Sequence, residues 1–122
     1  VLCGDVFALS TEVLETVLGG LATAVWDRAA LVALRPSDRS RYVSLQRSWT
    51  LPGSRVLLNV LNYDPAVMSG PPWCVDPEAV SALWGDQDLV LADRTSLYAQ
   101  EPRWQDLGHS WFDRDLYRIQ RR

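Results

Sequence analysis

Apolar residues fall along this chain in blocks whose spacing predicts alternating helices and strands. Between Ser10 and Leu18 they recur at helical intervals behind a serine that can cap the first turn, and Gly19 ends the segment. Ala22–Trp26 is a short continuous apolar run, which indicates a strand covered on both faces. Arg55–Tyr63 is a longer run of the same kind and predicts a central strand of a parallel sheet.

Helical segments and a turn separate these strands. Arg28–Leu34 is apolar on nearly every side, which predicts a short buried helical turn. Ser37–Trp49 follows a proline suited to a first helical turn and carries its larger apolar residues on one stripe, so it predicts an amphipathic helix. Leu51–Ser54 has the composition of a turn. Asp76–Gly85 begins with a cap residue and a proline in the order expected for another helix.

The two ends of the chain complete an α/β pattern. Val1–Phe7 is expected to be the tail of a buried strand, while Leu89–Arg94 and Trp111–Ile119 are expected to pair as an antiparallel hairpin. Asp64–Trp73 is typical of a shaped loop, and Ser96–Gly108 of an irregular, polar one. This order of elements predicts an α/β fold whose sheet is mostly parallel with a terminal antiparallel strand.

Composition narrows the class of protein. The 122 residues suit one domain, and a net charge of −3 argues against nucleic acid as a partner. No apolar run reaches the ~18 residues of a membrane span, and the start lacks the basic region of a signal peptide. Cys3 and Cys74 are expected to be free thiols in a cytoplasmic protein, because no secretory signal accompanies them. One histidine and two distant cysteines cannot form a zinc site.

Candidate chemistry lies where predicted strands end, because open parallel sheets bind ligands at the carboxyl ends of their strands. The four segments there are Gly4–Phe7, Trp26–Arg28, Asn62–Pro65 and the loop that contains Arg103. Plainer interpretations stay open: Asp27 and Arg28 can cap the following helix, and Tyr63–Pro65 can be only a turn. No nucleophile elbow, phosphate loop or paired acidic motif accompanies these segments.

The aromatic residues are expected to serve mainly the core. The tryptophans on core-facing stripes are Trp26, Trp49 and Trp84. Trp73 and Trp104 lie in loops, so their roles stay open, and an aromatic platform for carbohydrate is a weaker alternative function. His109 is expected to be a hydrogen-bonding loop histidine rather than a general base, because no serine or cysteine nucleophile motif accompanies it.

Several ordered segments together resemble one enzyme family. They are Ala24–Leu34 followed by Pro36–Arg39 and Tyr42, then Val60–Pro65 followed by Gly70–Trp73, and finally Arg103, Gly108 and Leu116–Tyr117. In this order they resemble the thiopurine S-methyltransferase family, a branch of the Rossmann-like class I methyltransferases. Plant-type thiol and halide methyltransferases carry a similar Gly-Pro-Pro loop, but the arginine after Trp26-Asp27 favours the thiopurine branch.

The resemblance implies roles for four residues and a cofactor, S-adenosylmethionine. Asp5 and Val6 match family positions that contact the adenine of the cofactor. Arg28 matches an arginine that lines the cofactor and substrate pocket, and Arg103 matches a second arginine in the loop over the substrate. Fixed guanidinium charge favours the thiolate that attacks the methyl group, so these arginines would position substrate, and no covalent enzyme intermediate or metal is needed.

The resemblance also implies that residues 1–122 are the C-terminal part of a Rossmann-like class I methyltransferase domain. The family's glycine-rich cofactor loop and ribose-binding acidic residue are not in the sequence, and Val1 is not an initiator methionine. We therefore expect the chain alone to be inactive. The parent is expected to be a cytoplasmic monomer that methylates a small thiol or a selenium or tellurium acceptor, without nucleic-acid or membrane partners. The alternative is a non-catalytic small-molecule-binding module derived from that fold.

Overall fold

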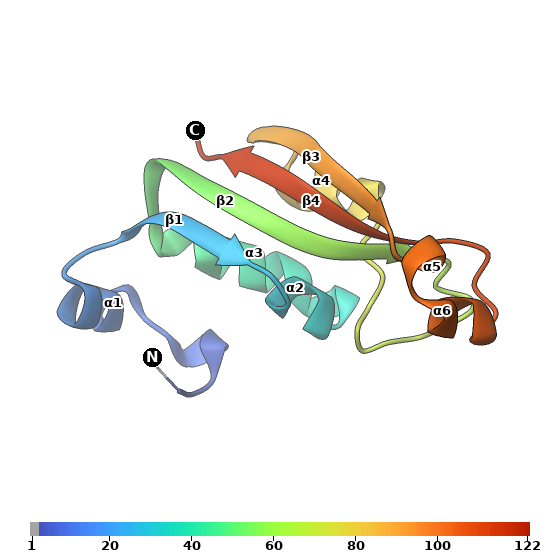
Figure 1. The fold of residues 1–122 in the computed structure, drawn as a ribbon. Coiled ribbons are helices and arrows are strands. Elements are labelled where there is room, and N and C mark those ends of the chain that lie inside the picture. Colours follow the sequence, from blue (N-terminus) through green and yellow to red (C-terminus); the bar gives the residue numbers. More distant parts are fainter. Residues whose placement is uncertain (1–2) are drawn as a thin grey trace.

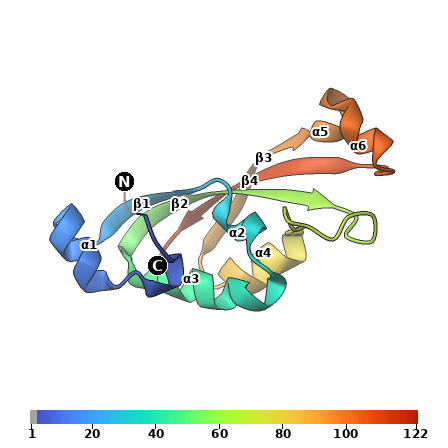
Figure 2. The same cartoon turned by 90° about the horizontal axis from the view of Figure 1, so that it is seen from below.

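The computed structural model describes residues 3–122, which form a four-stranded sheet with α2, α3 and α4 on one of its faces (Figures 1 and 2). No helix in this described part of the chain is long and apolar enough to cross a membrane. In chain order the elements are η1 (Val6–Ala8), α1 (Thr11–Leu18), β1 (Ala22–Asp27), α2 (Ala30–Ala33), η2 (Pro36–Asp38), α3 (Arg39–Ser48), β2 (Thr50–Tyr63), α4 (Pro77–Trp84), β3 (Asp88–Ser96), α5 (Leu97–Gln100), α6 (Pro102–Asp106) and β4 (Phe112–Gln120).

The sheet is mixed, with strand order β1-β2-β4-β3. β1 pairs with β2 in parallel, whereas β4 pairs antiparallel with both β2 and β3. The first three strands therefore run in one direction and the last strand runs against them. This arrangement confirms the expected α/β class, the terminal antiparallel strand and the β3–β4 hairpin.

Two helices begin and end where their local sequence predicts. The Ser10 hydroxyl accepts the Val13 backbone N–H at 3.3 Å, and Gly19 ends α1 with a φ of 77°, a conformation that favours glycine. The Asp76 carboxylate accepts the Ala79 N–H at 2.7 Å at the start of α4. Both caps confirm the helices expected after Ser10 and Asp76.

Two hydrophobic clusters hold the fold together. The main core lies between the sheet and helices α2–α4, and it includes Leu31, Tyr42, Leu58 and the 1% exposed Trp84. A second cluster lies under α5 and α6. Its buried members are Tyr63, Leu97, Trp104 and Phe112.

Three expected segments differ from the structure. Val1 and Leu2 lie outside the described residues, and residues 3–7 form no strand, because Asp5 caps the short η1 turn. The expected turn at residues 51–54 belongs to β2, since Gly53 and Ser54 extend the ladder by bonding to the Arg121 backbone. The segment expected to be irregular, residues 96–108, contains α5 and α6, because Leu97 and Trp104 are buried in the second cluster.

β1 is an edge strand and is not covered on both faces as expected. Trp26 is 69% exposed, so its expected place in the core is wrong, whereas Trp84 is buried and Trp49 is half-buried. The side chain of Trp26 lies on the sheet face opposite the helices, where it borders an open hollow of ≈500 Å³ with Leu57, Arg55 and Arg118. Within residues 3–122 the outer edge of β1 has no neighbouring strand, and exposed aromatic surface beside such an edge is typical of association sites.

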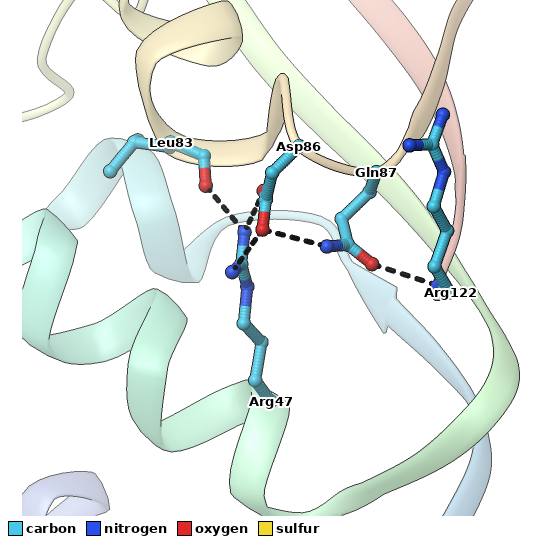
Figure 3. A network of polar contacts seen from close by, with 5 residues as sticks. All are labelled: Arg47, Leu83, Asp86, Gln87 and Arg122. Carbon is cyan, nitrogen blue, oxygen red and sulfur yellow. Dashed lines mark hydrogen bonds and ion pairs between the residues drawn. The ribbon is translucent and has the colours of Figure 1, made fainter.

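A polar network joins the ends of α3, α4 and β4 at the amino edge of the sheet (Figure 3). Arg47 donates to both carboxylate oxygens of Asp86, at 2.6 and 2.9 Å, and to the Leu83 carbonyl. Gln87 donates to Asp86 and accepts the backbone N–H of Arg122. The network therefore ties the last residue of the chain to two helices.

The Arg47–Asp86 pair should make the free energy of unfolding depend on pH in the acid range. Hydrogen bonds from Arg47 hold the pKa of Asp86 below its ordinary value of 3.8. Because the folded-state pKa is the lower one, this stabilisation is present above pH 3.8 and is lost as the pH falls through the folded-state pKa. We expect Arg47→Met to lower the urea midpoint near neutral pH, and the gap from wild type to narrow below pH 3.8. A gap that is independent of pH would assign the loss to packing on Trp84 instead.

Candidate functional site

Three strands end at the same edge of the sheet, and each is followed by a segment with candidate residues. Arg28 follows β1, Asp64 follows β2, and Arg103 lies in α6, shortly after β3. Figure 1 shows these strand ends pointing in one direction, with α5 and α6 beyond the end of β2. The expected convergence on a carboxyl edge thus holds for three of the four segments.

A buried carboxylate fixes the end of β1. The Oδ1 atom of Asp27 accepts the backbone N–H groups of Ala30 and Leu31, at 3.1 and 3.3 Å, and Oδ2 accepts from Gln46 at 3.4 Å. Burial, together with this carboxylate, raises the pKa of Tyr42. Asp27 therefore caps α2, which agrees with the interpretation that it caps the following helix. Arg28 is left exposed, and no carboxylate of residues 3–122 pairs with it.

The loop after β2 folds back onto the helices. The Tyr63 hydroxyl donates to the Pro72 carbonyl at 2.6 Å, and the Trp73 N–H donates to the Val32 carbonyl at 2.7 Å. At Gly70 the backbone has a φ of 78°, and a Cβ there would lie 2.7 Å from the Trp73 ring. The Gly-Pro-Pro-Trp segment therefore needs its glycine and makes a close, shaped wall at the edge.

Arg39 and Cys74 lie beneath this wall. Arg39 is buried, and its Nη2 donates to the Cys74 carbonyl at 2.8 Å. The Cys74 thiol donates to the Tyr63 carbonyl, and burial raises its pKa, so the thiol stays protonated near neutral pH. Cys3 and Cys74 are both free, as expected. The sequence indicates no role for Arg39 by itself; its signals are its place in the Pro36–Arg39 segment that resembles the family and on the same helical stripe as Tyr42.

Arg103 lies in the α5–α6 segment with its side chain largely exposed. Its guanidinium forms an ion pair with Glu101 at 2.6 Å and stacks over the Trp104 ring at 4.3 Å. Trp104 and His109 are buried beside Phe112, so they pack α6 against the end of the sheet. Because Trp104 is buried and Trp73 is half-buried, neither offers an open platform for stacking a sugar.

Arg28 and the segment that carries Arg103 lie at the same edge of the sheet, at positions that are offset along the strand direction. Asp27, just before Arg28, pairs with Leu58, whereas β2 continues five residues further to Tyr63, against which the α5–α6 segment packs. At about 3.3 Å per residue, this offset along the sheet is roughly 17 Å. Their joint action on one substrate stays a prediction.

The residues expected near adenine lie at the start of the described chain. Asp5 is exposed and accepts the Phe7 N–H at 2.9 Å, and Val6 is half-buried. Both border an open hollow of ≈350 Å³. The guanidinium of Arg41, in the first turn of α3, lies 4.4 Å from the centre of the Phe7 ring. This contact connects the segment to the helix that carries Arg39.

Comparisons with known proteins identify relatives across the whole chain. A family model described as thiopurine S-methyltransferase (TPMT) matches residues 1–122. The thiopurine S-methyltransferase of Xanthomonas campestris pv. campestris is 40% identical over 99% of the chain and 54% of its own length. Those of Bordetella petrii and Nitrosospira multiformis are 38% and 36% identical, over 52% and 53% of their own lengths. The chain thus spans about half the length of the curated relatives it matches.

Proposed function

The chain belongs to the thiopurine S-methyltransferase family, and from that premise we propose that its parent protein is an S-adenosylmethionine-dependent methyltransferase. We propose that the acceptor is a small thiol, or a selenium or tellurium species. The observation that carries this proposal is Arg28, an exposed guanidinium at the carboxyl edge of the sheet that pairs with no carboxylate of residues 3–122. The free thiols of Cys3 and Cys74 are in keeping with a cytoplasmic protein.

The residues present fit one side of a cofactor site. Val6 gives the hollow at residues 3–13 an apolar side chain suited to an adenine ring, and the exposed Asp5 carboxylate can accept a hydrogen bond from its amino group. S-adenosylmethionine supplies an electrophilic methyl group when bound. In this proposal Asp5 and Val6 hold its adenine.

Arg28 would act on the acceptor. A thiol must lose its proton before it attacks, and a guanidinium within a few ångströms lowers the pKa of that thiol. Arginine keeps its charge at every physiological pH, so it can hold a thiolate without exchanging a proton. Arg103 would act on a more distant part of the acceptor, once released from Glu101.

We propose further that residues 1–122 are one part of a single methyltransferase domain. The open sheet face around Trp26 and the unpaired edge of β1 supply the surface on which the rest of that domain would pack. This rest would contribute the glycine-rich cofactor loop, so the chain alone would be inactive and the full-length protein a monomer.

Calorimetry and a methyl-transfer assay test the proposal. The full-length protein should bind S-adenosylmethionine with one site and methylate a thiol or selenide. Residues 1–122 alone should do neither. Binding without transfer to any thiol or chalcogen would favour the non-catalytic module, and the absence of both from the full-length protein would overturn the proposal.

Self-association of residues 1–122 tests the domain proposal separately. We expect the isolated chain to sediment as dimers or larger species, because Trp26 and the β1 edge are left uncovered. Trp26→Lys should shift the distribution toward monomer by placing a charge on that face. A monodisperse wild-type monomer would contradict the expectation.

A further inference from the structure

A buried guanidinium lies directly beneath the loop that follows β2. Arg39 begins α3 and is only 6% exposed, and its Nη2 donates to the Cys74 carbonyl at 2.8 Å. Its Nε is buried and has no hydrogen-bond partner among residues 3–122. No carboxylate of residues 3–122 lies within ion-pair distance of it.

A buried arginine without a carboxylate partner is not expected to stabilise the fold more than an apolar residue would. Burial lowers the pKa of Arg39, which means that its environment disfavours the charge. One hydrogen bond to a neutral carbonyl returns less than the desolvation of a guanidinium costs, and apolar residues of similar volume serve a core as well or better. The charge is therefore better explained by what it holds in place.

It holds the second half of the loop. The Trp73 N–H donates to Val32 of α2, the Cys74 carbonyl accepts from Arg39 of α3, and the Val75 N–H donates to Leu61 of β2. Residues 73–75 are thus fixed to three elements within three positions.

The first half of the loop, residues 64–69, packs Met68 against the second hydrophobic cluster, but its hydrogen bonds are only local. Around Asp64 it makes short-range turn bonds, from Ala66 to the carboxylate and from Val67 to the carbonyl. The second half of the loop is therefore held to other elements by hydrogen bonds, whereas the first half contacts the core through the Met68 side chain. Of the hydrogen bonds that hold residues 73–75, the one from Arg39 is made by a charged side chain of the helix layer.

We propose that Arg39 is a positioning residue, which fixes the Gly70–Cys74 wall of the acceptor pocket at the carboxyl edge. The inference rests on the proposed function, because it takes the acceptor to be bound there. Arg39 does not touch the acceptor. It acts through the Cys74 carbonyl, and a shift of this wall displaces the acceptor relative to the methyl donor.

The test compares Arg39→Met with Arg35→Met in the full-length protein. Arg35 is exposed and precedes the same helix, so it controls for loss of an arginine. We expect Arg39→Met to lower kcat/KM for the acceptor by about 10- to 100-fold, since small misplacements of a reactant cost rates of this order. The KM for S-adenosylmethionine should stay at the wild-type value, and Arg39→Lys should recover part of the loss. An equal rise of both KM values, or no change of either, would overturn the proposal.

Hydrogen exchange separates the failure of this inference from failure of the proposed function. In Arg39→Met the Trp73 and Val75 amides should exchange faster than in wild type, while amides of β2 and β4 keep their protection. If the wild type transfers no methyl group, the proposed function fails and this readout still reports on the hydrogen bond from Arg39. If the wild type is active and these amides are unchanged, the positioning role fails alone. Should Arg39→Met not fold, Arg39→Lys decides, with smaller changes in the same direction expected.

Discussion

Replacing Arg28 with methionine in the full-length protein is expected to lower kcat/KM for a thiol acceptor by about 100-fold near neutral pH. The exposed guanidinium has no carboxylate partner among residues 3–122, so its charge is available to a bound thiolate. Loss of one preorganised hydrogen-bond donor to a developing anion typically costs about 2.7–4 kcal/mol of activation free energy, which sets the scale expected for Arg28. Initial rates at varied acceptor concentration measure the change.

The pH dependence of this loss identifies its cause. A free thiol of pKa about 8.5 is mostly ionised above about pH 9, so the variant should approach wild type there. Arg35→Met, which removes an exposed arginine nearby, should keep the wild-type rate at both pH values. A loss that is the same at both pH values would contradict a role in thiol ionisation.

Trp84→Ala is expected to have the largest effect on stability. Trp84 is 1% exposed in the main core, and the Arg47 guanidinium lies over its ring. Truncating a buried tryptophan typically costs about 3–5 kcal/mol, a large part of the 5–15 kcal/mol that stabilises a typical protein. Urea denaturation followed by circular dichroism should give a lower midpoint or no folded baseline.

Trp111→Ala provides the matched control. Trp111 is 38% exposed and precedes β4, so its truncation should cost less than about 1 kcal/mol. Equal losses for the two variants would mean that the core between α4 and the sheet contributes less than its burial indicates.

Elements specified by nearby residues were predictable from the sequence. Ser10 and Gly19 bound α1, and Asp76 begins α4, because each cap residue hydrogen-bonds to a backbone group three or four positions away. Elements that depend on residues distant in the sequence were not predictable. Residues 51–54 look like a turn, yet pairing with Arg121 at the other end of the chain draws them into β2. Trp26 looks like a core residue, but its exposure depends on what neighbours β1 in space.

The same distinction holds for the candidate site. Arg28 could be placed at the carboxyl edge because it follows a predicted strand, and strand ends collect on one edge of such a sheet. Arg39 could not be singled out, since its bonded carbonyl at Cys74 is 35 positions away and belongs to a loop without a regular pattern. The offset between Arg28 and Arg103 follows from the unequal lengths of β1 and β2, which the apolar runs do not fix.

The placement of β4 between β2 and β3 has a consequence for biosynthesis. Within residues 3–122, β3 pairs only with β4, and β4 is formed by residues 112–120. While the ribosome is still adding those residues, both edges of β3 are unpaired. The sheet surface on which α4 packs is also incomplete. The sheet can be completed only when β4 has left the ribosomal exit tunnel and pairs between β2 and β3. Folding of this part of the sheet should therefore wait for residues 112–120, and a chain that stops before β4 should leave β3 unpaired and prone to aggregation.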